Sequence, residues 1–167
     1  KADKMGLTLV VRLNGTSDIP WENEPILFVT VPLPPESGYE CELQGLTIFE
    51  CFPNTQYYDY SKYPTRHKLP ANYHLTFSYS GVDSFKPIVK KWRDKRTEQN
   101  MAVVFESEQA KYQTKFYNVV NGDESDLRFL DKRSAVPGYN NHFVVVGLTA
   151  KGNAKNDVTG FVVRPGA

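Results

Sequence analysis

The chain has 167 residues and a formal net charge of +1, from 20 Lys or Arg and 19 Asp or Glu. With 40% hydrophobic and 23% charged residues, its composition is neither that of a disordered chain nor that of a coiled coil, and the length suits a single domain over residues 1–167. No apolar run approaches the roughly 18–20 residues that a membrane span requires.

The first third of the chain predicts three strands. Apolar residues alternate from Leu7 to Leu13, which is the period of a strand. The continuous run 26–31, apolar except for Thr30, is typical of a strand buried on both faces, and the Pro-rich residues 32–35 end it. Residues 39–52 predict one long strand in which Gly45 marks a bulge.

Tyrosines and prolines gather in residues 53–70 without a clear period. We expect a long ordered loop there, and long loops in compact domains commonly serve function or form interfaces. Tyrosine is also enriched at protein interfaces. The candidate subunit-interface residues are therefore Tyr57, Tyr58, Tyr60, Tyr63 and Arg66.

The rest of the chain predicts further short strands and one short helix near 85–96, in which Pro87 lies in the first turn. Asn121-Gly122 predicts a turn. Segments rich in Val, Ile and Thr favour an all-β fold. About eight or nine unevenly spaced strands predict an antiparallel β-sandwich of the jelly-roll or Greek-key type, in preference to an up-and-down barrel. The later strands are expected at 73–79, 101–105, 112–120, 127–130, 143–148 and 158–163.

The predicted helix holds the densest group of positive charges. Residues 1–61 carry three basic and nine acidic side chains, whereas 62–115 carry eleven and five. Such an uneven distribution of charge suits packing between copies of the chain or binding of an anion at one face. The alternative is that folding intermixes the acidic and basic segments, so that their charges average out. Because Lys and Arg neutralise phosphates and an indole stacks on bases, the candidate nucleic-acid-binding residues are Lys86, Lys90, Lys91, Trp92, Arg93, Lys95 and Arg96. The alternative is a solvated helix face with its indole turned to the core.

The sequence holds no phosphate-binding glycine loop, nucleophile elbow or metal-binding helix motif. His67, His74 and His142 lack Cys or carboxylate neighbours at the spacing of zinc ligands. Acidic Asp123, Glu124 and Asp126 follow the predicted turn but lack the spacing of an EF-hand. We therefore expect no enzymatic activity, no metal and no cofactor.

Cys41 and Cys51 are the only cysteines, and neither a tight hairpin nor a continuous strand over this segment would bring them into bridging distance. Two thiols indicate a reducing compartment. Secretion is the alternative, because Asn14-Gly15-Thr16 matches a glycosylation motif.

The segment from Tyr39 through Phe52 to Pro53, after a buried strand and a Pro-rich turn, resembles the early strands of single jelly-roll capsid proteins of small icosahedral viruses. The closing strand 143–148 suits the last strand of such a roll. One departure concerns the Arg-rich arm with which such proteins usually open and hold the genome, because residues 1–61 contain only Lys1, Lys4 and Arg12 as basic residues. Either such an arm was removed or precedes residue 1, or the likeness is only that of a shared sandwich. The residues that resemble a loop of circovirus-type capsids are Tyr60, Arg66, His67, Leu69, Pro70 and His74.

The resemblance implies self-assembly into a shell around nucleic acid, without catalysis. The leading prediction is therefore a viral coat subunit, whose partners are copies of itself and nucleic acid, found in the virion or in the host nucleus or cytoplasm. The alternative is a carbohydrate-binding β-sandwich that uses Trp21 or the Tyr57 to Tyr63 cluster as a stacking platform.

Overall fold

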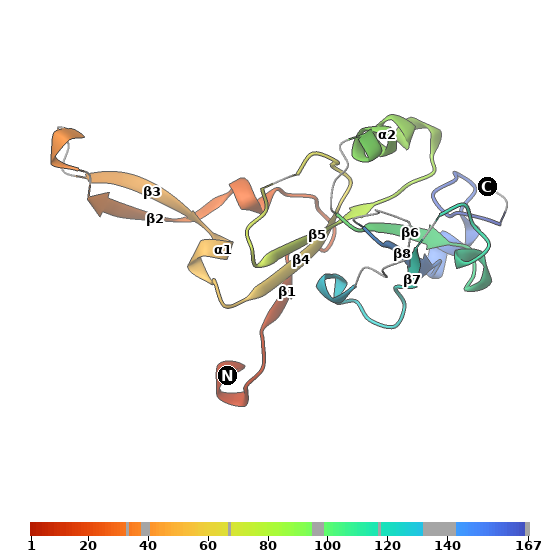
Figure 1. Cartoon of the computed structure of the whole chain (residues 1–167), viewed down its shortest axis with the longest axis horizontal. Helices are drawn as coiled ribbons and strands as arrows, with labels where there is room; N and C mark the ends of the chain where they lie inside the picture. The colour runs from red at the N-terminus through yellow and green to blue at the C-terminus, as the bar shows by residue number, and fades with distance from the viewer. Residues whose placement is uncertain are drawn as a thin grey trace. The chain divides into compact units, whose positions relative to one another are not determined.

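The structure is a computed structural model that describes residues 1–32, 34–37, 41–66, 68–94, 99–116, 118–131 and 143–165 (Figure 1). Of Asp3, Ser37, Cys41 and Glu42 it describes the backbone alone. The chain divides into two compact units. The first unit comprises residues 1–57 and 68–73, and the second comprises 58–67 and 74–167. The expectation of one domain over the whole chain stays a prediction.

The first unit is built on a two-stranded antiparallel ribbon. Strand β2 (Pro25–Pro32) pairs with β3 (Cys41–Thr47), and this pair forms a sheet of its own. A short strand, β1 (Val10–Arg12), precedes the ribbon, and helix α1 (Ile48–Cys51) follows it directly. Single 3-10 turns lie at Asp3–Met5, Trp21–Asn23 and Pro35–Ser37.

Helix α1 corrects the predicted long strand 39–52, which ends at Thr47. Thr47 and Glu50 form a capping box, in which the backbone N–H and the hydroxyl of Thr47 donate to Glu50 Oε2 at 2.7 and 2.9 Å. These bonds also lower the pKa of Glu50. A Thr followed three residues later by Glu is a start signal for a helix, and here it outweighs the apolar, strand-like character of Ile48 and Phe49.

The second unit contains most of a larger sheet. Its strands are β4 (Gln56–Ser61), β5 (Tyr73–Ser78), β6 (Met101–Phe105), β7 (Val119–Asn121) and β8 (Val145–Thr149), and helix α2 (Lys86–Asp94) connects β5 to β6. The first residues of β4 and β5 belong to the first unit. Further 3-10 turns lie at Asp83–Phe85, Gln109–Lys111, Arg128–Leu130 and Gly152–Asn156.

The predicted antiparallel jelly-roll sandwich is wrong. The large sheet has the strand order β1-β4-β5-β6-β8-β7, and β5 with β6, β6 with β8 and β7 with β8 all pair in parallel. The β5-α2-β6 crossover explains the first of these pairs, because parallel neighbours need a long connection and a helix commonly supplies it. A helix predicted between two strands already indicated this arrangement.

Several strand predictions also fail. The described residues of 112–120 and 127–130 contain only the start of the short β7 and a 3-10 turn, respectively. Residues 158–163 contribute a single bridge between Phe105 and Val163. Strand β4 lies inside the predicted loop 53–70. Tyr57, Tyr58 and Asp59 are all buried in it, so its two faces are covered and no alternation of polar and apolar residues marks it.

Most of the hydrophobic core lies in the second unit. The α2-facing cluster includes Phe77, Trp92, Met101, Val103 and Phe105. Trp92 stacks on Phe77 with ring centroids 5.2 Å apart and meets Phe143 edge-on at 4.8 Å. The opposite face of the sheet buries a smaller cluster of Ala102, Val144 and Val146.

Candidate functional site

The first unit exposes most of the large apolar side chains that reach solvent. Among the described residues, thirteen large apolar side chains are exposed, and nine of them belong to this unit. We call these nine the apolar surface of the first unit: Met5, Leu7, Leu9, Ile19, Ile26, Leu27, Phe28, Leu43 and Phe52. Four of the nine lie on β2 and β3, and exposed apolar side chains that gather on one element favour an interaction site there.

The same unit has a small core. Of eighteen buried apolar residues among those described, only Phe49, Tyr57 and Tyr73 belong to it. Phe49 stacks on Tyr73 with ring centroids 4.6 Å apart and meets Tyr57 edge-on at 5.0 Å. The amide of Asn72 helps to hold this cluster, donating to the carbonyls of Phe49 and Thr55 at 3.3 and 3.2 Å. So small a core contributes little burial energy.

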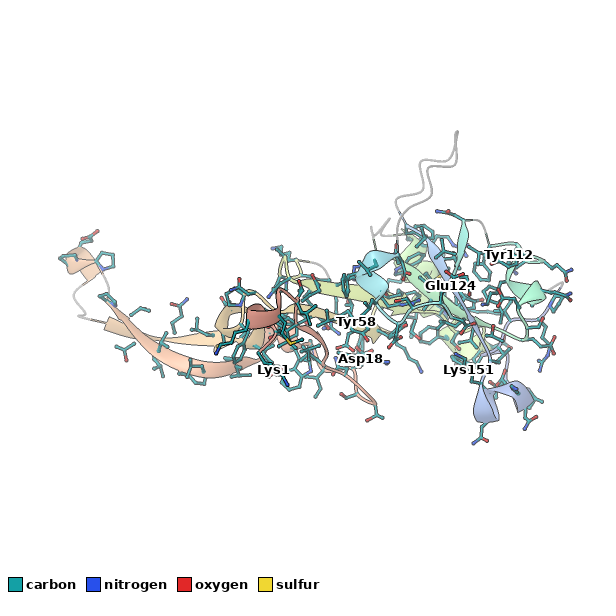
Figure 2. The ribbon with its side chains drawn as sticks, turned by 90° about the horizontal axis from the view of Figure 1, so that it is seen from below. Lys1, Asp18, Tyr58, Tyr112, Glu124 and Lys151 are labelled. Atoms are coloured by element: carbon teal, nitrogen blue, oxygen red, sulfur yellow. The ribbon has the colours of Figure 1, made fainter. Side chains whose placement is uncertain are left out.

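The β2–β3 ribbon carries exposed apolar side chains on both of its faces. Successive residues of a strand point to opposite faces, and Leu27 and Phe28 are 48% and 57% exposed. Figure 2 shows the side chains of β2 and β3 on either side of the ribbon, with no other element of the first unit over them along most of its length. Within the residues that the structure describes, each strand of the ribbon has the other as its one partner.

Gly45 allows Phe28 to lie across the ribbon. Phe28 is opposite Gly45 in the register, and a Cβ at Gly45 would lie 2.8 Å from Pro25 Cβ and 3.2 Å from Phe28 Cε1. The ring thus covers the backbone of its neighbour, a pairing that stabilises glycine within a sheet. The predicted role of Gly45 as a bulge is wrong, because the register shift lies between Pro25 and Leu27 instead.

The predicted nucleic-acid-binding residues differ in their exposure and in their ion pairs. Lys86, Lys90, Lys91 and Arg93 are exposed, but Lys86 pairs with Asp83 at 2.7 Å and Lys90 with Asp94 at 2.6 Å. Lys95 and Arg96 lie outside the described residues. Trp92 is 4% exposed, so its indole packs in the core, as the alternative prediction had it, and offers no face to a base.

The predicted subunit-interface residues also differ in their exposure. Tyr57, Tyr58 and Arg66 are buried, Tyr60 is half-buried, and Tyr63 alone is 59% exposed. The hydroxyls of Tyr58 and Tyr60 donate to the Asp126 carboxylate at 3.0 and 3.4 Å. Most of this cluster therefore contributes to the chain's own packing, and the structure does not bring it together as one exposed surface.

A buried lysine that the sequence analysis missed lies beside the ends of β7 and β8. Lys111 is fully buried, and its Nζ donates to Glu108, Asn121 and Asp123 at 2.7 to 2.8 Å. Burial alone would lower the pKa of Lys111, but its bonds to Asp123 and Glu108 raise it. All three N–H groups are occupied and the charge is retained, so this lysine is a structural tie and not a nucleophile.

A second buried cation, Arg128, lies under the opposite face of the sheet. Its Nη2 donates to the carbonyl of Gly122 at 3.0 Å, and its Nε lies 3.4 Å from Asp131 Oδ2. Burial and the Arg128 charge lower the pKa of His74 to about 4. Burial raises the pKa of Asp131, against the pull of Arg128. These contacts join the two ends of the segment from Gly122 to Asp131, and the bonds from Tyr58 and Tyr60 to Asp126 attach this segment to β4.

The remaining candidate groups from the sequence are the histidines and acidic residues considered as metal ligands and the glycosylation motif at Asn14. No three His, Cys, Asp or Glu side chains among the described residues are arranged to hold a metal ion, and His67 and His142 lie outside them. Asn14 is 3% exposed, and its Oδ1 accepts from the indole of Trp21 at 3.0 Å. The side chain of Asn14 is therefore not accessible for glycosylation in this conformation. No helix in the described part of the chain has the length and apolar character to cross a membrane.

Comparison with known proteins gives one finding. A family model described as Gene product 88 matches residues 1–165, which includes nearly all of both units. No curated protein and no solved structure matches the chain. The family description states no activity, so any inference about function rests on the geometry above.

Proposed function

The chain belongs to the Gene product 88 family, and we propose that it is a self-associating protein whose first unit is completed by another copy of the chain. The apolar surface of the first unit is the contact. The small core of this unit is the physical reason, because a two-stranded ribbon in water is marginally stable without a further strand or a covering element.

One observation carries this proposal. Residues 26–31 form an apolar run, interrupted only by Thr30, of the kind found in strands buried on both faces. Ile26, Leu27 and Phe28 are nevertheless about half exposed, at 46 to 57%. A single copy of the chain does not provide the burial that this sequence is suited to. A contact between copies would provide it.

Of the coat-subunit prediction, the proposal keeps the association of copies and drops the icosahedral shell. The jelly-roll fold on which the icosahedral shell depended is absent, so we do not propose that shell. Association of copies does not require that fold, and the apolar surface of the first unit supports it. Contact with nucleic acid and carbohydrate binding stay untested predictions, and the burial of Trp92 and of most of the tyrosine cluster gives neither of them support.

The mass of the full chain in solution tests the proposal. Light scattering after size-exclusion chromatography at physiological salt should give a mass well above the 19.0 kDa of one chain. Phe28→Asp should shift the protein toward the single-chain mass, because it places a charge in the contact. Val158→Asp is the matched control, since Val158 is an apolar residue of the second unit that is 90% exposed.

Two outcomes would overturn the proposal. One is a single-chain mass for the unmodified protein at every concentration. The other is an equal loss of mass in both variants, which would show a general effect of added charge and no role for the ribbon.

A further inference from the structure

The outer edge of β2 is an open site for backbone pairing in the first unit. Among the described residues β2 pairs with β3 alone, which leaves the N–H and C=O groups of its other side without a strand. Open edges of this kind template pairing with another chain unless charges, prolines or a covering element protect them. Here protection is limited to Pro25 and Pro32 at the two ends.

The residues between these prolines suit pairing with themselves. Ile26 to Val31 contains no charged side chain and consists mainly of β-branched and aromatic residues, the types that strands prefer. Antiparallel pairing of this segment with its own copy opposes no like charges at any register. Strand β3 contains Glu42 and lies between Glu40 and Glu50, so its edge is the less suitable one.

Symmetry fixes the centre of such a pair. Two copies of one strand that pair antiparallel are related by a two-fold axis perpendicular to the sheet, and facing residues must point to the same side. One residue therefore lies opposite itself. The prolines limit the pairing to residues 26–31, and the middle of this segment is Phe28 and Val29.

We propose that two copies of the chain associate by antiparallel pairing of β2 with β2, about a two-fold axis at Phe28 or Val29. This inference rests on the self-association proposed above and names the edge that makes it. The product is a four-stranded sheet in the order β3-β2-β2-β3. It exceeds the three strands at which a small sheet becomes independently stable, and the prolines stop the pairing at its ends.

Single cysteines test this pairing in the full chain. In a background carrying Cys41→Ser and Cys51→Ser, one cysteine is placed at Leu27, Phe28, Val29 or Thr30 and the protein is oxidised gently. Leu43→Cys on β3 is the matched control, because Leu43 is 68% exposed and belongs to the other edge. Covalent dimers are counted on a denaturing gel without reductant, and the mass of each reduced variant is measured alongside.

Facing residues have Cβ atoms about 4.5–5.5 Å apart and diagonal neighbours about 7–8 Å, and a disulfide requires close to the smaller separation. We therefore expect cross-linking to peak at either Phe28→Cys or Val29→Cys, severalfold above the other positions, with Leu43→Cys at background. The Val29 variant keeps the test informative if loss of the Phe28 ring disturbs the ribbon.

The outcomes separate the two proposals. Assembly by mass together with strong cross-linking at Leu43, or with none at 28 and 29, overturns β2 pairing and leaves self-association standing. A single-chain mass with no cross-link at any position overturns both.

Discussion

At the scale of single residues, the buried polar groups hold the second unit together. Lys111 and Arg128 are each fully buried. Lys111 pairs with Asp123 in the turn after β7, and Arg128 pairs with Asp131. Leaving a buried charge without its partner is strongly destabilising. Lys111 and Arg128 therefore stabilise the segments next to β7 through Asn121 and Gly122, and the surface proposed above for contact between copies includes neither of them.

His74 predicts a pH dependence of stability. Its pKa is about 4 in the folded chain and 6.5 without the fold, because burial and the Arg128 charge disfavour its protonated form. The unfolded chain therefore takes up a proton at higher pH than the folded chain does. His74 leaves stability unchanged above pH 6.5, and the free energy of unfolding falls as the pH drops from 6.5 to 4, by about 3 kcal/mol in all.

His74→Gln isolates this contribution. The difference in unfolding free energy between the unmodified chain and the variant, measured by urea titration at several pH values, should shrink between pH 6.5 and 4. Taking the difference cancels Asp131, whose raised pKa acts in the opposite direction. A constant difference across this window would show that His74 is protonated equally in both states.

At the scale of elements, α2 is anchored by its one buried side chain. Trp92 stacks on Phe77 and contacts Phe143, while its neighbours Lys91 and Arg93 are exposed. The helix thus packs an aromatic residue inward and directs its cations to solvent.

Trp92→Ala should lower the free energy of unfolding by about 3–5 kcal/mol, the usual cost of removing a large buried aromatic side chain. Lys91→Ala on the same helix should change it by less than about 0.5 kcal/mol, as exposed substitutions generally do. Chemical denaturation of both variants measures the difference. Similar effects for the two would contradict the packing of α2 described above.

The elements also show what the sequence can predict. Strands β2, β5, β6 and β8 and helix α2 lie close to where period, composition and Pro87 predict them. The direction of pairing could not be predicted from strand patterns alone. Strand β4 escaped detection because both of its faces are covered, whereas α1 carried a readable signal in Thr47 and Glu50 that the apolar run obscured.

The sequence partly indicates the surface that we propose for contact between copies. Residues 26–31 form a strand, as their composition predicts, but burial on both faces does not occur within one copy of the chain. Sequence patterns report that a segment suits burial and do not identify what buries it. The roles of Lys111 and Arg128 depend on contacts between distant segments, and no local pattern marks them.

At the scale of the whole molecule, the two units differ in charge and in core. The first unit has four basic and eight acidic residues, and the second has sixteen and eleven. The second unit holds fifteen of the eighteen buried apolar residues described. We infer that the second unit is stable within one copy, whereas the first depends on association, so its stability should rise with protein concentration.

Amide hydrogen exchange of the full chain at low and high protein concentration tests this claim most directly, because it reads each unit separately. The account predicts that exchange in Ile26 to Val31 slows as the concentration rises, while exchange in β6 and β8 stays slow throughout. Fast exchange in Ile26 to Val31 that is unchanged across the concentration range would contradict it.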